Sequence, residues 1–136
     1  MRYWIVKFAP FRVSWEHILA TGKFEIYSIR GIQAQNNLKA MSIGDLVLFY
    51  HSQKELCVMG IMTVVREAHQ DFTTKDDRWK SVTFQPVESF KNPISLSKIK
   101  SVVSLKNTTL VRQPRLSVGE ISENEFNIIK SLSSIN

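Results

Sequence analysis

Four amide side chains lie close together in the segment IRGIQAQNNLKAM, residues 29–41: Gln33, Gln35, Asn36 and Asn37. Asn is a poor helix former, and charged residues would serve equally well on the exposed face of a short helix. An amide can both donate and accept hydrogen bonds. The segment therefore indicates a surface that forms hydrogen bonds with a partner.

Aromatic and hydroxyl groups supply a second set of candidates. Trp79 follows DDR and begins the segment WKSVTFQPV, whose alternation places it on the same face as polar residues. A tryptophan is more often a core residue, but this one is expected at a rim where a planar base could stack. The segment FYHS ends an apolar run and offers Tyr50, His51 and Ser52 at a binding edge. For His51 alone, a structural histidine is the stronger alternative.

The positive charge is concentrated in one part of the chain. Of the net charge of +6, the segment from Ser89 to Val118 supplies all six units, from the bases Lys91, Lys98, Lys100, Lys106, Arg112 and Arg115, with no acid. Such a segment is typical of a surface that binds a polyanion, with Lys98, Lys100, Arg112 and Arg115 as candidate phosphate contacts. A merely solvated face is the alternative.

Within that segment, LVRQPRLSV, residues 110–118, combines charge with a stiff backbone. Pro114 opposes a regular helix, so Arg112, Gln113 and Arg115 are expected side by side on a loop. Arginine can bind phosphate, and an amide can contact the edge of a base. Ordinary salt bridging is the alternative.

Other kinds of chemistry find little support. His17, His51 and His69 are far apart, and Cys57 is the only cysteine, so no metal-ligand spacing exists. No phosphate-binding glycine loop or nucleophile motif is present, and the apolar neighbours of Cys57 do not favour a reactive thiolate. We expect no metal and no cofactor. An enzyme site assembled in space stays open as an alternative.

The elements that must position these residues alternate along the chain. Strand-like patterns cover residues 2–9, 45–52, 56–67 and 79–87, and helical patterns cover 14–22, 32–41, 95–101 and 122–132. Ser14 and Gly22 can cap the first helix, Ser122 and Glu125 form a capping box in the last, and Gly60 can mark a bulge. The two central runs are apolar almost throughout, which predicts a sheet buried on both faces. The fold class is α+β.

Length and composition fit one compact domain. The chain has 136 residues, of which 43% are hydrophobic and 22% charged, which predicts a single domain over residues 1–136. No apolar run is long enough to span a membrane, and the first residues lack the features of a signal peptide. We expect no membrane partner and a cytoplasmic location, or a nuclear one in a eukaryote.

The order of these segments resembles the EVE domain family, within the PUA-like superfamily. The resemblance rests on YWIVK, IRGIQAQNNL, MSIGDLVLFYHS, VMGIMTVVREAHQD, DDRWKSV and LVRQPRLSV, and it covers nearly the whole chain. It implies a PUA-like mixed β pseudobarrel with short peripheral helices. It also implies a role in reading modified nucleobases, chiefly modified cytosine in DNA, or RNA, without catalysis.

The resemblance also implies which residues line a cleft for the base. They are Lys7, Arg30, Gln33, Asn36, Asn37, Tyr50, His51, Ser52, Trp79 and Gln113. Two positions depart from the family pattern: Ile26 replaces a tryptophan, and Phe8 replaces the serine that often follows the first lysine. Tyr27 is a candidate replacement for the missing indole, and RGIQAQ stands where RNYQAR is common, so specificity can differ from that of relatives.

The leading hypothesis is a non-catalytic module that binds nucleic acid by capturing one modified base, such as 5-methylcytosine. The basic segment would bind the phosphate backbone, and the cleft would provide selectivity. Two alternatives stay open: an enzyme acting on a modified nucleotide or small ligand, with His51 and Ser52 as acid–base partners, and a protein-interaction domain. Oligomeric state is not predicted by the sequence.

Overall fold

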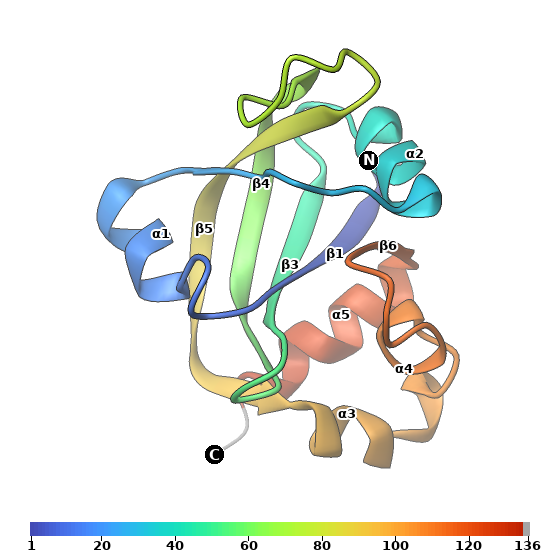
Figure 1. Ribbon diagram of the computed structural model, residues 1–136. Helices are drawn as coiled ribbons and strands as arrows, with labels where there is room; N and C mark the ends of the chain where they lie inside the picture. The colour runs from blue at the N-terminus through green and yellow to red at the C-terminus, as the bar shows by residue number, and fades with distance from the viewer. Residues whose placement is uncertain (135–136) are drawn as a thin grey trace.

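The computed structural model describes residues 1–134, and a mixed six-stranded sheet lies at its centre (Figure 1). Its strands follow the order β2-β5-β4-β3-β1-β6 across the sheet. Only β1 and β3 pair in parallel; the other neighbouring strands are antiparallel. The strands are β1 (Tyr3–Phe8), β2 (Phe24–Glu25), β3 (Leu46–His51), β4 (Cys57–Gln70), β5 (Lys80–Ser95) and β6 (Val118–Ile121).

Short helices pack around this sheet, as the sequence predicts for an α+β fold. They are α1 (Trp15–Thr21), α2 (Ile32–Ala40), α3 (Leu96–Ser101), the 3₁₀ helix η1 (Val103–Leu105), α4 (Thr109–Arg112) and α5 (Glu123–Leu132). Within the described residues, no helix is long and apolar enough to cross a membrane.

Both faces of the sheet are buried, each by its own group of helices. In β1, Trp4 and Val6 belong to a core that includes residues of α1 and α2, whereas Ile5 belongs to a second core with residues of α3, α4 and α5. Successive side chains of a strand point to opposite faces, so one strand supplies both cores. This burial explains why the central strands are apolar almost throughout.

The helix caps form as predicted. The Ser14 side chain accepts a hydrogen bond from the His17 amide, and Gly22 ends α1 with a φ of 77°, which favours glycine. Ser122 and Glu125 form a complete capping box at the start of α5. These local signals place both helices correctly because they depend on neighbours only three residues away.

A bulge at Gly60 bends the centre of the sheet, as the sequence predicts. Phe49 pairs with Gly60 but Tyr50 pairs with Val58, so Met59 is the extra residue. A Cβ atom on Gly60 would collide with the Trp15 indole and with the Glu88 carbonyl oxygen. Glycine at this position therefore lets α1 press directly against β4.

Two local predictions are corrected. The strand predicted over residues 79–87 is longer than expected and continues to Ser95. It can contain Pro86 and Pro93 because its pairing with β4 shifts register repeatedly, so that not every backbone amide has to donate. Arg112 lies in the last turn of helix α4, not on a loop, because Pro114 disfavours helical backbone only from the residue before it. Helix α4 ends at Arg112, and Gln113, the residue before Pro114, has a non-helical φ of −127°.

Candidate functional site

A cavity that is lined by several of the predicted residues opens where β1 and β3 end together. It is a cavity of about 520 Å³, lined by Lys7, Arg12, Tyr50, Ser52 and Arg115 among others, and we call it the Lys7 cavity. Lys7 and Tyr50 are register partners in the parallel pair, so the two strands deliver both side chains to the same edge. Aliphatic groups of Leu56, Leu96, Leu110 and Leu116 complete the wall.

Lys7 is the most unusual residue of this cavity. Its side chain is buried, with 7% of the residue exposed, and its Nζ donates to the carbonyl oxygens of Gln113 at 3.1 Å and Pro114 at 3.3 Å. Burial disfavours the charged form and lowers the pKa of Lys7 to about 8. An ammonium carries three hydrogens, so one is left over for a ligand.

Tyr50 and Ser52 add neutral hydroxyl groups to the same wall. Tyr50 is buried, and loss of hydration together with the nearby Cys57 raises the pKa of its phenol to about 12. The phenol therefore keeps its proton at physiological pH and can donate as well as accept a hydrogen bond. Ser52 follows the end of β3, and its backbone amide donates a hydrogen bond to the Phe8 carbonyl oxygen at 3.0 Å.

A row of aromatic rings runs from the cavity toward the loop at residues 71–79. The Phe8 and Tyr27 ring centroids are 5.4 Å apart, and those of Tyr27 and Phe72 are 5.6 Å apart. The Arg12 guanidinium lies 4.2 Å from the Phe8 centroid and 5.0 Å from that of Tyr27. Sequence reasoning missed Arg12, because a single arginine outside the basic segment carries no signal of its position.

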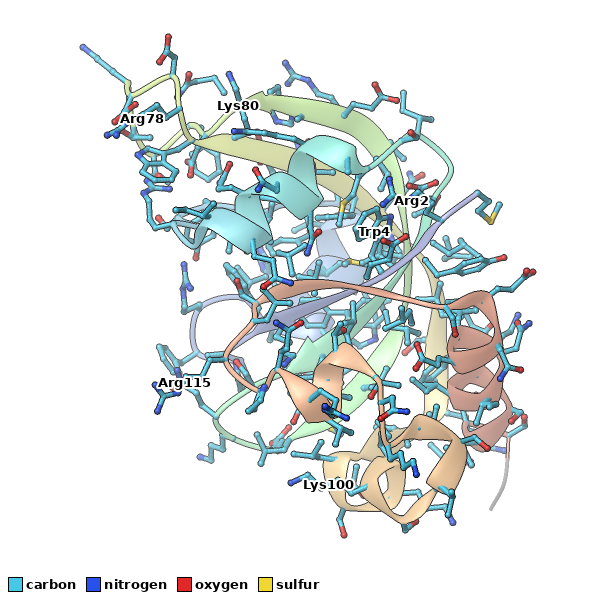
Figure 2. All side chains as sticks on the ribbon, turned by 90° about the vertical axis from the view of Figure 1, so that its right-hand side faces the viewer. Arg2, Trp4, Arg78, Lys80, Lys100 and Arg115 are labelled. Carbon is cyan, nitrogen blue, oxygen red and sulfur yellow. The ribbon has the colours of Figure 1, made fainter. Side chains whose placement is uncertain are left out.

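Trp79 and Arg30 do not line the Lys7 cavity; they belong to a separate cluster. Arg30 lies 5.0 Å from the Trp79 ring centroid and donates to Asp71 at 3.2 Å, while Arg78 lies 5.2 Å from the same ring and donates to Asp76 at 2.6 Å. We call these five residues the Trp79 corner. Figure 2 shows Arg78 well apart from Arg115, which lines the cavity.

Asp71 anchors the Trp79 corner. It is fully buried and accepts hydrogen bonds from the Ser28 amide, from the amide and hydroxyl of Thr73, and from Arg30. Burial opposes the charge, but these hydrogen bonds together outweigh it and hold the pKa of Asp71 below its ordinary value. The carboxylate thus ties residues 28–30 to the loop at 71–79.

Two of the four helix amides bind the protein's own backbone. Gln35 is buried, donates to the Ile29 carbonyl oxygen at 2.7 Å and accepts from the Lys80 amide at 3.0 Å. Asn37 donates a hydrogen bond to the Val118 carbonyl oxygen at 2.7 Å and so connects α2 to the edge strand β6. These two amides therefore fasten α2 to the sheet.

The other two amides remain at the surface. Gln33 and Gln113 bind each other, with Gln113 Nε2 donating to Gln33 Oε1 at 3.1 Å. This pair joins α2 to the segment whose carbonyl groups hold Lys7. Asn36 is exposed on the same helix. None of these three residues lines the cavity.

His51 has the environment of a structural histidine, which the sequence left open as the alternative to a ligand contact. Its Nε2 accepts a hydrogen bond from the Trp15 amide at 3.1 Å, and its Nδ1 lies 3.4 Å from the Phe8 carbonyl oxygen. Accepting at Nε2 requires the neutral ring, and burial lowers the pKa of His51 accordingly. With both ring nitrogens directed at backbone groups, the ring has no nitrogen directed at Ser52.

Of the four predicted phosphate contacts, Arg115 belongs to the cavity lining and the other three lie outside it. Helix α3 begins at Leu96, which lines the cavity, and carries Lys98 and Lys100 in its last turn. Arg115 lines the cavity directly, whereas Arg112 donates to Asn107 at 3.0 Å. Figure 2 shows Arg115 and Lys100 apart from each other, at the left and at the bottom of the view. Within residues 1–134, no three candidate metal ligands come together.

Comparisons with known proteins agree with this architecture. A family model described as EVE domain matches residues 2–132. Thymocyte nuclear protein 1 of Homo sapiens is 34% identical to this chain, in an alignment that covers 76% of this chain and 56% of that protein. The chain thus spans little more than half the length of that relative.

Two solved structures extend the likeness to the whole fold. The crystal structure of a protein from Agrobacterium tumefaciens matches with a TM-score of 0.96 and 36% identity, covering 99% of this chain and 94% of that one. The crystal structure of human THYN1 protein in complex with DNA containing 5-methylcytosine matches with a TM-score of 0.93 and 28% identity, covering 100% and 99%. The predicted PUA-like α+β fold is confirmed.

Proposed function

The chain belongs to the EVE domain family, and from this premise we propose that it is a non-catalytic module that binds DNA by recognising a modified cytosine. One observation carries the proposal. Human THYN1 protein, whose structure was solved with DNA containing 5-methylcytosine, matches this chain along its full length. The Lys7 cavity is large enough for one nucleotide and is lined by both polar and apolar groups, as ligand sites generally are.

The predicted residues divide into four groups. Lys7, Tyr50 and Ser52 line the cavity and would contact the captured nucleotide. Arg30 and Trp79 form part of the Trp79 corner, where they would contact a neighbouring nucleotide. Gln33, Asn36, Asn37, His51 and Gln113 would support the walls or rim, and Lys98, Lys100, Arg112 and Arg115 would contact phosphates.

This division separates affinity from selectivity. Phosphate contacts act on every sequence and weaken as salt is added, because binding releases counterions. Contacts to a base captured in the cavity distinguish one base from another. Selectivity for the modified base should therefore persist at a salt concentration that weakens binding overall.

The environment of His51 supports a binding role over an acid–base role. A general base needs a free lone pair, and the Nε2 lone pair of His51 already accepts from the Trp15 amide. Among the three functions that the sequence left open, we therefore favour nucleic-acid binding.

The proposal is tested by titrating matched short strands with plain cytosine or 5-methylcytosine, as DNA and as RNA, at low and moderate salt. We expect the methylated DNA strand to bind most tightly, with a preference over plain DNA that survives added salt. Equal binding to all strands that disappears with salt would reject base recognition. Methylated RNA binding as tightly as methylated DNA would remove the assignment to DNA.

Two finer parts complete the proposal. We infer that residues 1–136 act as one domain, because a single sheet connects both cores. We also infer a nuclear location in a eukaryotic cell and a cytoplasmic one in a bacterium, where the DNA lies. Cell fractionation with an antibody against the native protein tests the location.

A further inference from the structure

The Lys7 cavity has an unbalanced charge. Lys7, Arg12 and Arg115 line it, and none of the described residues in its lining is acidic. Within residues 1–134, none of these three cations forms an ion pair, whereas Arg2, Arg30, Arg78 and Lys130 each lie within 4.0 Å of a carboxylate oxygen. The three cations around the cavity therefore have no carboxylate partner among the described residues, and Lys7 is the one of them that is buried.

Lys7 makes this imbalance costly. Burying an ammonium group without an opposite charge is unfavourable, and two carbonyl oxygens replace only part of its lost hydration. A methionine or leucine would fill the same space without that cost. The position of Lys7 is explained if an anion enters the cavity and completes its coordination.

The hydrogen-bonding character of the wall points to the same ligand. Lysine and arginine can only donate, while hydroxyl groups of Tyr50, Ser52 and Ser117 can donate or accept. Donors outnumber acceptors, so a ligand group made only of acceptors fits best. Phosphate and carboxylate groups have this property, and arginine binds both in a two-pronged geometry.

We propose that the Lys7 cavity binds an anionic oxygen group of the captured nucleotide, with Lys7 at its base and Arg12 and Arg115 at its rim. The inference rests on the proposed function and specifies the ligand chemistry of that site. Two sources supply such a group: the phosphate of the captured nucleotide, or a carboxylate carried at the 5-position of the cytosine ring.

The experiment compares small ligands that differ by one charged group. Deoxycytidine is compared with deoxycytidine 5′-monophosphate, and 5-methyldeoxycytidine with 5-carboxydeoxycytidine, by calorimetric titration of the full chain at pH 7. Inorganic phosphate serves as a competitor. Because a hydrogen bond to a charged group is stronger than a neutral one, we expect an anionic ligand to bind about tenfold tighter than its neutral counterpart.

Two variants and one control connect this preference to the cavity. Lys7→Met removes the buried charge at similar length and should abolish the preference. Arg115→Gln, at an exposed position that does not threaten folding, should reduce it severalfold. Lys39→Met removes a charge from the exposed end of α2, outside the cavity, and should leave the preference unchanged.

The outcomes separate the two sources and decide the inference. A preference confined to the monophosphate identifies the phosphate, and one confined to 5-carboxydeoxycytidine identifies the base substituent; both support the inference. Equal affinity for charged and neutral ligands would overturn it, as would a preference that survives both Lys7→Met and Arg115→Gln. Such a failure would not affect the conclusion from the DNA titration, because plain and methylated cytosine are both neutral and the proposed function is tested by the difference between them.

Discussion

The Trp79 corner and the Lys7 cavity both gather positive charge beside aromatic rings, yet they treat that charge differently. In the Trp79 corner, Arg30 and Arg78 are neutralised by Asp71 and Asp76. In the cavity, Lys7, Arg12 and Arg115 form no ion pair with any carboxylate of residues 1–134. Both places combine basic and aromatic residues, and the carboxylates of Asp71 and Asp76 distinguish the Trp79 corner.

The difference separates structural charge from available charge. An arginine that is paired with a carboxylate and stacked on a ring holds two segments together, and a ligand would have to compete with that carboxylate. A cation without such a partner can bind an incoming anion directly. We therefore expect the Trp79 corner to influence stability most and the cavity to influence binding most.

The largest effect is expected from Asp71→Ala. The substitution leaves the Ser28 and Thr73 amides without their acceptor and removes the partner of Arg30. We expect the free energy of unfolding to fall by about 3 kcal/mol, measured by urea denaturation. Asp77→Ala, at an exposed position of the same loop, should change it little. The comparison breaks down if both variants lose equal stability.

Raising the pH should have opposite effects on two properties of the protein: the affinity of the cavity for an anion should fall, and the free energy of unfolding should rise. Lys7, with its pKa of about 8, loses its proton above pH 8, whereas Tyr50, with its pKa of about 12, stays neutral. Deoxycytidine 5′-monophosphate should therefore lose the preference that the Lys7 charge provides and bind about tenfold more weakly at pH 10 than at pH 7, measured by calorimetry.

Stability should change in the other direction over the same range. Between pH 8 and 10.5 the folded protein sheds a proton that the unfolded chain keeps, so the Lys7 contribution to the free energy of unfolding rises with pH. The Lys7→Met variant should lack both effects. Binding of the monophosphate that stays constant from pH 7 to 10 in the unmodified protein would contradict the assignment to Lys7.

A smaller effect is expected from Trp79→Ala. Its ring would stack on a nucleotide beside the captured one, so binding to plain and methylated strands should weaken by about fivefold, the loss of about 1 kcal/mol of stacking. The ratio of the two affinities should stay within about twofold, because Trp79 does not line the cavity. Fluorescence titration of both strands checks this, and a ratio that collapses would move base recognition to the Trp79 corner.

The smallest effect is expected from Gln33→Ala. The substitution removes an exposed amide pair with Gln113, which is expected to change the free energy of unfolding by about 0.5 kcal/mol or less. Affinity for methylated DNA should change by less than about twofold in the same titration. Asn37→Ala, which removes a hydrogen bond to β6, should cost more stability. A tenfold loss of affinity in Gln33→Ala would show that the amides contact the ligand directly.

Local patterns predicted most of the fold. The unbroken apolar run Trp4, Ile5 and Val6 fits a strand with two buried faces, and the Ser122 and Glu125 pair marks the start of α5. These features depend on neighbours in sequence. Helix α4 was missed, and Arg112 was expected on a loop, because Pro114 disfavours helical backbone only at the residue before it and leaves Arg112 free to be helical.

The site was harder to predict because its partners are distant in sequence. The FYHS segment made Tyr50 a candidate and the family resemblance added Lys7, but the carbonyl groups that hold Lys7 come from Gln113 and Pro114, more than a hundred residues later. The Asn37 acceptor is Val118, a partner that no pattern near Asn37 reveals. Such contacts follow from strand order, which the sequence does not display.

The parallel pairing of β1 and β3 separates the cavity into parts that can change independently. Its base belongs to two central strands whose register places Lys7 beside Tyr50. Its rim belongs to surface segments, among them the connection between β3 and β4, where Gln53 and Glu55 adopt positive φ values of 68° and 65°. Lengthening or exchanging that connection would alter the ligand range while leaving the sheet register intact, which makes the rim the natural place to engineer a reader for another base.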